Sequence, residues 1–324
     1  MGSDDVSSDD VSTERADDAG VSMPRLPHRM RDRAESIARG RTTWDVPVPR
    51  DAATVCLLRE DASGIEVFVM RRTTSMAFAA GMHVYPGGAV EDSDAAVPLA
   101  GRSDLDDVAL RTSSLDPRAL LVAAARETYE ECGVLLAVTP EGATPVADDD
   151  LDTDRLALVA GDLSFAEVLG RRGLVVDDAA LVPFAHWVTP EVEDRRYDTR
   201  FFMTAVPVGQ RARHVEGEAD RSTWWRPAEA LSAYAEGSMA MLPPTLAVMN
   251  MLAACPDVAT ALRLAGRADV WPILPAPVLD DAGDVVWHLV NARTRAVFAI
   301  GEEPPASETD GVGAVAVPPV VDGV

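Results

Sequence analysis

The chain contains few cysteines, few aromatic residues and few cations for its length. Its 324 residues include three cysteines, 5% aromatic residues, and 29 Lys and Arg residues against 53 Asp and Glu residues. The cysteines, Cys56, Cys132 and Cys255, lie far apart among apolar neighbours. This spacing argues against a disulfide framework or a zinc site and predicts reduced core thiols in a cytoplasmic protein.

Long apolar runs are also missing. No stretch approaches the roughly 18 consecutive apolar residues of a membrane span, and the acidic N-terminus argues against a secretory signal. The formal net charge of −24 would repel nucleic acid and anionic membranes. We therefore expect no membrane and no nucleic acid polymer as partner. A small phosphorylated substrate remains compatible, because arginines and bound metal can reverse the charge inside a pocket.

With 47% hydrophobic residues, the chain can bury a substantial core. Residues 1–45 predict an N-terminal tail that is acidic and disordered at first and then basic. Within its basic part, residues 25–41, a short surface helix is favoured over a phosphate-binding arm. Residues 46–255 predict one domain and residues 301–324 a flexible tail. Between them, residues 256–300 predict an extension with a hairpin, packed on the domain or used in a homodimer contact.

A β-hairpin opens the predicted domain. Residues 54–58 and 65–70 are rich in apolar and β-branched side chains, and the turn residues 61–64 separate them. Further along, Ser164 and Glu167 form a capping-box pattern that predicts a helix ending at Gly173. Residues 143–154 are expected to be a polar loop. These elements are interpreted as scaffold.

A helix is predicted at residues 118–132. Asp116 can cap its start, Pro117 suits its first position, and Gly133 supplies a left-handed stop. At about 100° per residue, three glutamates fall within one arc, and apolar residues cluster on the opposite side. These glutamates are Glu127, Glu130 and Glu131.

This acidic stripe makes poor sense as helix stabilisation, because like charges at i,i+3 and i,i+4 repel one another. One interpretation is a solvated helix face. The other is a site for hard divalent cations, since Mg²⁺ takes oxygen ligands and bridges to substrate phosphates. The upstream pair Gly87–Gly88 favours the second interpretation, because a segment without Cβ atoms lets its backbone approach a ligand or ion closely.

Gly88, Asp94 and the run Arg126-Glu127-Thr128-Tyr129-Glu130-Glu131-Cys132-Gly133-Val134 resemble the Nudix box of the Nudix hydrolases, which cleave nucleoside diphosphates linked to another group. Two departures stand out. The family has Glu where this chain has Asp94, and a long spacer separates the two halves of the motif. Residues 95–115 are therefore expected to be an insertion, forming a loop with a short helix.

Two more stretches resemble the coenzyme A and acyl-coenzyme A diphosphatase branch of this family, whose peroxisomal type also interrupts its box. One contains Arg72, Gly81 and Tyr85-Pro86-Gly87-Gly88, although Ala77 stands where the coenzyme A pattern has an arginine. The other contains Trp187-Val188-Thr189-Pro190 and Arg196-Tyr197-Asp198-Thr199-Arg200-Phe201-Phe202. His83 and His186 are predicted to be structural groups.

The resemblance implies a metal site on the predicted helix. Mg²⁺ or Mn²⁺ would be held by Glu127, Glu130, Glu131 and the Gly88 carbonyl. Arg126 would orient the glutamates, and Asp94 would support the ligands from behind. A loop carboxylate would serve as base or extra ligand. Glu218 has the expected spacing from Trp224, and Glu216 is the fallback. The alternative is an acidic loop without a role.

Substrate contacts are expected from Arg72, Tyr85, Gly87, Trp187 and Arg196. Arginines beside aromatic side chains suit a phosphate and an adenine ring. The alternative for the second stretch is a surface arginine pair next to a core Phe-Phe pair. The two interpretations stay open at this point.

The resemblance implies a Nudix α/β/α sandwich with a mixed central sheet, followed by the C-terminal extension. It also implies metal-dependent attack of water on a diphosphate, with coenzyme A or an acyl derivative as the preferred substrate. The alternatives are an ADP-ribose, dinucleotide or nucleotide-sugar diphosphatase, and a non-catalytic nucleotide-binding module of the same fold. The complete glutamate trio argues against the binding module, which would have no need of three clustered carboxylates.

Overall fold

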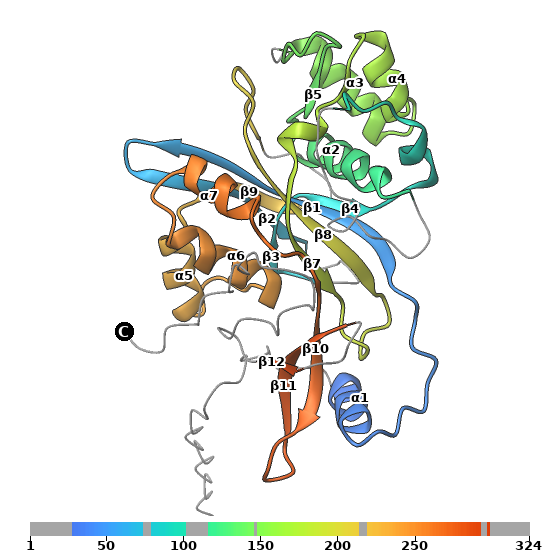
Figure 1. Ribbon diagram of the computed structural model, residues 1–324, viewed down its shortest axis with the longest axis vertical. Helices are drawn as coiled ribbons and strands as arrows, with labels where there is room; N and C mark the ends of the chain where they lie inside the picture. The colour runs from blue at the N-terminus through green and yellow to red at the C-terminus, as the bar shows by residue number, and fades with distance from the viewer. Residues whose placement is uncertain are drawn as a thin grey trace, which may run out of the picture.

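The computed structural model describes residues 28–73, 79–101, 116–145, 148–213, 219–292 and 297–298. Its centre is one mixed β-sheet (Figure 1) with the strand order β12-β11-β10-β7-β8-β1-β2-β3. In addition, β4 pairs with β1 and β9 with β2. The bounds are β1 Arg50–Asp61, β2 Gly64–Arg72, β3 His83–Val84, β4 Gly87–Ala89, β7 Val182–Val188, β8 Tyr197–Ala205, β9 Ala219–Trp225, β10 Pro272–Leu279, β11 Val285–Asn291 and β12 Val297–Phe298.

The sheet combines both strand directions. β1 runs parallel to β8, and β7 runs parallel to β10, whereas the other neighbours are antiparallel. The predicted hairpin is confirmed as β1 and β2, in which Asp61 pairs with Gly64 at the turn. The long parallel ladder between β1 and β8 joins parts of the chain that are far apart in sequence.

Helices cover both faces of the sheet (Figure 1). On one side lie α2 (Arg118–Cys132), α3 (Asp149–Val159) and α4 (Phe165–Arg171), with the small strands β5 (Ala137–Val138) and β6 (Val175–Val176). On the other side lie α5 (Pro227–Ala235), α6 (Pro243–Ala253) and α7 (Val258–Ala265). Two short 3-10 helices, η1 (Asp92–Ala96) and η2 (Asp178–Ala180), complete this part. The predicted α/β/α sandwich with a mixed sheet is confirmed.

The side chains of β1 alternate between two hydrophobic clusters, one on each face of the sheet. Val55 and Leu57 join the cluster under α2, whereas Cys56 and Leu58 join the cluster under α5, α6 and α7. All four side chains are fully buried. Because successive side chains of a strand point to opposite faces, one continuous apolar run can supply both layers.

Local signals define both ends of α2. Asp116 Oδ1 accepts a hydrogen bond of 3.0 Å from the Arg118 N–H, which satisfies one of the free donors at the helix start. Gly133 ends the helix with φ of 73°, a left-handed conformation that glycine adopts without steric cost. The predicted limits of this helix are confirmed.

Other parts refine the expectations. The capping box at Ser164 is present and starts α4, but the expected polar loop at residues 143–154 contains the start of α3. The basic segment forms α1 (His28–Ala38), as predicted. No helix in the described ranges has the length and apolar character needed to cross a membrane.

The C-terminal extension is part of the sandwich. α7 packs in the core beside β7 and β8, and β10 pairs in parallel with β7. The residues after 255 therefore pack against the sheet formed by residues 46–255. The predicted hairpin is β11 with β12, which pair in antiparallel fashion. β10, in the proline-containing segment before it, adds a further strand on the other side of β11. Most of the predicted insertion, residues 102–115, lies outside the described residues.

Candidate active site

The predicted glutamate stripe meets the diglycine segment. β4 pairs with β1 directly beside α2. The Gly87 N–H donates a hydrogen bond of 2.7 Å to Glu131 Oε2. At Gly88, a Cβ atom would lie 2.3 Å from Glu127 Oε1, so a larger residue here would displace the carboxylate from its present position. Two of the three glutamates are thus in direct contact with the backbone of β4.

A buried arginine organises the acidic side of the site. Arg126 is 4% exposed and Asp94 is 1% exposed. The guanidinium donates to Asp94 through Nε at 2.9 Å and Nη2 at 3.0 Å. Its Nη1 donates to Glu127 Oε1 at 2.8 Å and lies 3.5 Å from Glu130 Oε2. A second bond from Nη2 reaches the Ala89 carbonyl at 2.9 Å.

This network defines the geometry of Asp94 and Arg126. The bidentate pair fixes the guanidinium plane, and the guanidinium in turn contacts two of the predicted metal ligands. Burial disfavours the charged guanidinium, but its carboxylate partners, Asp94 first, raise the pKa of Arg126 above its ordinary value. Burial raises the pKa of the Glu130 carboxyl, and Arg126 opposes that effect. Arg126 therefore remains cationic among these acids.

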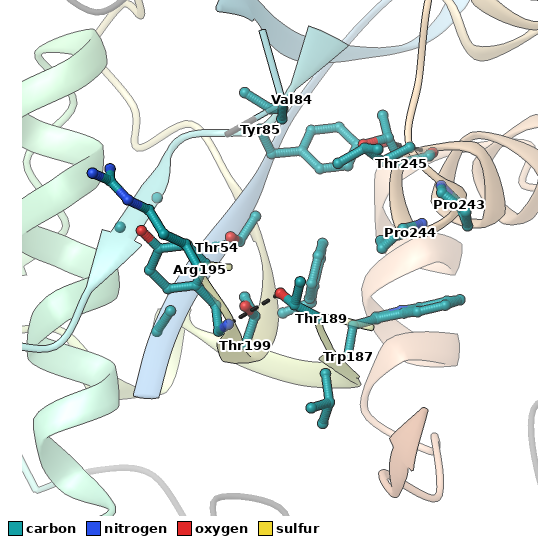
Figure 2. A pocket seen from close by; sticks show the side chains of 18 of the residues that line it. Thr54, Val84, Tyr85, Trp187, Thr189, Arg195, Thr199, Pro243, Pro244 and Thr245 are labelled. Atoms are coloured by element: carbon teal, nitrogen blue, oxygen red, sulfur yellow. Dashed lines mark hydrogen bonds between the residues drawn. The ribbon is translucent and has the colours of Figure 1, made fainter. Parts of the chain in front are cut away.

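A cavity of about 470 Å³ opens beside the glutamates. It extends from the diglycine segment to the first turn of α6, between α2 and β4 on one side and α6 on the other (Figure 2). Tyr85, Trp187 and Phe201 give one part of its lining an aromatic character. Further lining residues are Thr54, Gly87, Gly88, Glu127, Thr189, Glu193, Arg195, Tyr197, Thr199, Pro243, Pro244 and Pro275.

The cavity contains most of the residues expected to bind substrate. Arg72, Tyr85, Gly87 and Trp187 all line it. Tyr85 is 3% exposed, and its hydroxyl donates to the Thr245 carbonyl at 3.3 Å. This bond joins the diglycine segment to the start of α6, so the two sides of the cavity are connected at Tyr85.

Arg196 is placed differently from the other predicted substrate contacts. It is 9% exposed and lies outside the cavity lining, because its Nε donates to the Thr189 carbonyl and its Nη1 to the Pro47 carbonyl, both at 2.9 Å. Its neighbour Arg195 lines the cavity instead. The lining residues Arg195, Tyr197 and Thr199 follow an alternating pattern, which places Arg196 on the other side of the chain.

Sequence reasoning also missed Glu193 and the first turn of α6. Glu193 precedes Arg195 by two residues and lines the same cavity. The alternation of Glu193, Arg195, Tyr197 and Thr199 was available as a signal. No local signal linked Pro243 and Pro244 to the diglycine segment, since only the packing of α6 on the sheet brings them together.

A second buried ionic cluster lies on β1, β7 and β8. Asp51 lies opposite Asp198 in the register of the parallel strands β1 and β8. His186 lies opposite Arg200 in the register of the antiparallel strands β7 and β8. Asp198 contacts both His186 and Arg200. Burial acts to raise the pKa of Asp198, but these two partners outweigh it and lower the pKa. Burial and then Asp198 raise the pKa of Asp51, whose Oδ1 is buried without a hydrogen-bond partner among the described residues.

The two predicted structural histidines have contacts within the fold. His186 belongs to this cluster. His83 Nδ1 lies 3.2 Å from the Ala240 carbonyl oxygen. The backbone N–H of His83 donates to the same oxygen at 2.8 Å. The predicted loop carboxylates Glu216 and Glu218 lie outside the described residues.

The donor set at the diglycine segment fits a hard divalent cation. In the described ranges no three carboxylate, imidazole or thiol groups converge as a ready-made metal site. However, Glu127 and Glu131 both reach the Gly87–Gly88 backbone, and the Glu127 carboxylate occupies the space that a Cβ atom at Gly88 would fill. Carboxylate and carbonyl oxygens are the ligands that Mg²⁺ prefers.

Comparison with known proteins gives consistent results. Residues 105–252 match the family model described as the NUDT19 Nudix domain. The chain is 25% identical over 233 residues to the acyl-coenzyme A diphosphatase NUDT19 of Xenopus laevis, covering 60% of this chain and 61% of that protein. It is 26% identical to the putative nudix hydrolase 7 of Caenorhabditis elegans, covering 64% and 62%. The chain thus spans about three fifths of the length of these curated relatives.

Among solved structures, the chain is similar to a NUDIX hydrolase from Alicyclobacillus acidocaldarius. The two are 32% identical with a TM-score of 0.57. The match covers 68% of this chain and 97% of that chain. Nearly the whole of that hydrolase therefore has a counterpart here.

Proposed function

This chain belongs to the Nudix hydrolase family, and from this premise we propose that it hydrolyses the diphosphate of a small nucleoside-diphosphate-linked substrate, preferably coenzyme A or an acyl-coenzyme A. One observation carries the proposal. Glu127 and Glu131 meet the Gly87–Gly88 backbone at one end of a cavity of about 470 Å³. A cavity of this size takes a ligand of nucleotide dimensions.

The chain's own residues would hold and orient the reacting groups. When bound by Glu127, Glu130, Glu131 and the Gly88 carbonyl, Mg²⁺ or Mn²⁺ would neutralise phosphate oxygens and activate a water molecule. Arg126 would restrain the orientation of the glutamates that it contacts. Asp94 would hold the guanidinium in place, and such outer contacts tune a metal site strongly. Glu218 would supply the base or an extra ligand.

Three observations support a substrate of the coenzyme A type. The cavity combines a diglycine segment with an aromatic region around Trp187 and Phe201, which suits a phosphate group joined to a planar ring. Two curated relatives are named acyl-coenzyme A diphosphatase. The chain also carries most of the coenzyme A pattern. The arginine missing at Ala77 keeps ADP-ribose, dinucleotides and nucleotide sugars as rivals.

The test is a Glu131→Gln variant assayed with Mg²⁺ and Mn²⁺ on a panel of coenzyme A, acyl-coenzyme A, ADP-ribose, dinucleotides and nucleotide sugars, with products identified by mass. We expect turnover to fall about 100-fold or more, because a metal ion supplies several kcal/mol of charge stabilisation. Glu141→Gln changes an exposed carboxylate on a turn and serves as the matched control. Turnover at the wild-type rate in the Glu131 variant would reject the site, and the panel would decide the substrate class.

A further inference from the structure

The loop between β7 and β8 presents its side chains in two directions. Glu193 and Arg195 line the cavity, whereas Val192 is buried and Asp194 faces α1. The base of the loop is closed by backbone bonds. The Thr189 N–H donates to the Tyr197 carbonyl at 2.9 Å. The loop is therefore a structured wall of the cavity.

Arg195 is positioned to receive an anion. Its side chain reaches across the cavity toward β4 and α2 (Figure 2), where the proposed reaction would take place. It is exposed and makes no hydrogen bond or ion pair with the described part of the chain. A guanidinium presents several N–H donors in one plane and binds phosphate oxygens in pairs. Since the opposite wall is acidic, a bound diphosphate would gain from a cation on this side.

Helix α1 holds the same loop from behind. Arg33 Nη1 donates to the Val192 carbonyl at 2.8 Å and lies 2.8 Å from Asp194 Oδ1. Arg29 also pairs with Asp194, at 3.0 Å. The two cations differ in exposure, since the Arg29 side chain is 69% exposed and that of Arg33 is 12% exposed. Exposed ion pairs contribute little, so Arg33 is the effective contact.

We propose that Arg195 binds the diphosphate of the substrate from the side opposite α2, and that Arg33 is a positioning residue that acts through the loop carrying Arg195. The inference rests on the proposed function for its substrate class. It gives the basic N-terminal helix a role in substrate binding without contact to the substrate. The alternation at residues 192–195 explains how one short loop serves both purposes.

The first experiment measures binding of inorganic pyrophosphate to the full chain by calorimetry, in the presence of Mg²⁺. Arg195→Ala should weaken binding by about 10- to 100-fold, as for loss of a hydrogen bond to a charged group. Arg195→Lys should restore part of the affinity. Arg267→Ala removes an exposed arginine that follows α7 and should leave binding unchanged. Unchanged affinity in Arg195→Ala would overturn the proposal.

Coenzyme A and dephospho-coenzyme A separate the diphosphate from a terminal phosphate. We expect Arg195→Ala to weaken both to the same degree. A loss confined to coenzyme A would assign Arg195 to the terminal phosphate and overturn the proposal. These titrations do not depend on turnover. If the wild-type protein cleaves none of the diphosphates, the proposed function alone is refuted. If Glu131→Gln abolishes turnover but Arg195→Ala binds pyrophosphate as tightly as the wild type, this inference alone is refuted.

A double-mutant cycle tests the positioning role. Arg33→Ala should weaken pyrophosphate binding by about 3- to 10-fold, with Arg31→Ala on the same helix as the control, since Arg31 is exposed. In the Arg195→Ala background, Arg33→Ala should have no further effect, because coupled residues are not additive. Asp194→Asn should reproduce the weaker binding in a second way. If the loss of affinity in the double variant equals the product of the two single losses, Arg33 does not act through Arg195.

Discussion

The two walls of the cavity are built in different ways. The wall of β4 and α2 holds a dense polar network in which Arg126 alone makes contacts with Asp94, Glu127, Glu130 and the Ala89 carbonyl. The opposite wall combines the β7–β8 loop, the first turn of α6 and Pro275 of β10. The first wall is suited to fixed chemistry, since its positions are over-determined. The second is suited to substrate selection, because its segments can vary independently.

Two buried aspartates differ in how well their charges are compensated. Asp94 is bound by two nitrogens of one guanidinium, so its charge is compensated. Asp51 has an Oδ1 without a hydrogen-bond partner among the described residues and lies beside a second carboxylate, Asp198. Buried charges are tolerated only where they are paired and hydrogen-bonded. The cluster on β1, β7 and β8 is therefore the less well-satisfied of the two.

The largest expected effect concerns the first wall. Asp94→Ala would leave the buried Arg126 without its bidentate partner, and removing one member of a buried pair costs about 3–5 kcal/mol. Thermal and urea unfolding should show this loss, and diphosphatase activity should fall with it because Arg126 is released. Asp92→Ala changes an exposed aspartate in the same 3-10 helix. Equal unfolding free energies for the two variants would contradict a rigid first wall.

The two glycines separate stability from activity within this wall. A Cβ on Gly87 would lie 2.3 Å from the Ala53 carbonyl oxygen, so Gly87→Ala should destabilise the fold by about 1–3 kcal/mol through strain. A Cβ on Gly88 would meet the Glu127 carboxylate, which can rotate away. Gly88→Ala should therefore lower activity with a smaller loss of unfolding free energy. The reverse order in unfolding experiments would contradict this assignment.

The smallest expected effect tests the second cluster. Because the pKa of Asp51 is raised, the folded state binds its proton more tightly than the unfolded state does, and stability falls as pH rises from the ordinary aspartate pKa to the raised one. Asp51→Asn removes this loss. The variant should gain up to about 1 kcal/mol at pH 7, and the gain should shrink as the pH falls below the ordinary value. A variant less stable than wild type at pH 7 would show that Asp51 is well paired.

The first wall could be predicted from the sequence because its signals are local. Asp116 and Gly133 define the limits of α2, and the helical period places the glutamates on one stripe. The second wall depends on contacts between distant segments. The motif that contains Arg196 does not specify which side of the chain faces the cavity, and the alternation of side chains places Arg195 there. The role of residues 243–244 follows only from the packing of α6.

The prolines of β10 make this strand hard to recognise from the sequence. Pro275 and Pro277 lack N–H groups, and proline in the middle of a sequence segment argues against a central strand. These prolines are two residues apart, so the missing donors belong to one edge of the strand and the other edge keeps its hydrogen bonds. β10 pairs with β11 along its length from Ile273 to Leu279. Prolines at this spacing are therefore compatible with a paired strand.

The pairing of β10 with β7 limits how the molecule can be shortened. A fragment ending at residue 255 would lose α7 and β10 together, and it would leave the backbone of β7 as an unpaired sheet margin next to apolar side chains. Such margins pair with other chains and promote aggregation. Expression of a minimal catalytic unit should therefore extend at least to Asn291, the last residue of β11, so that the added strand keeps its own partner.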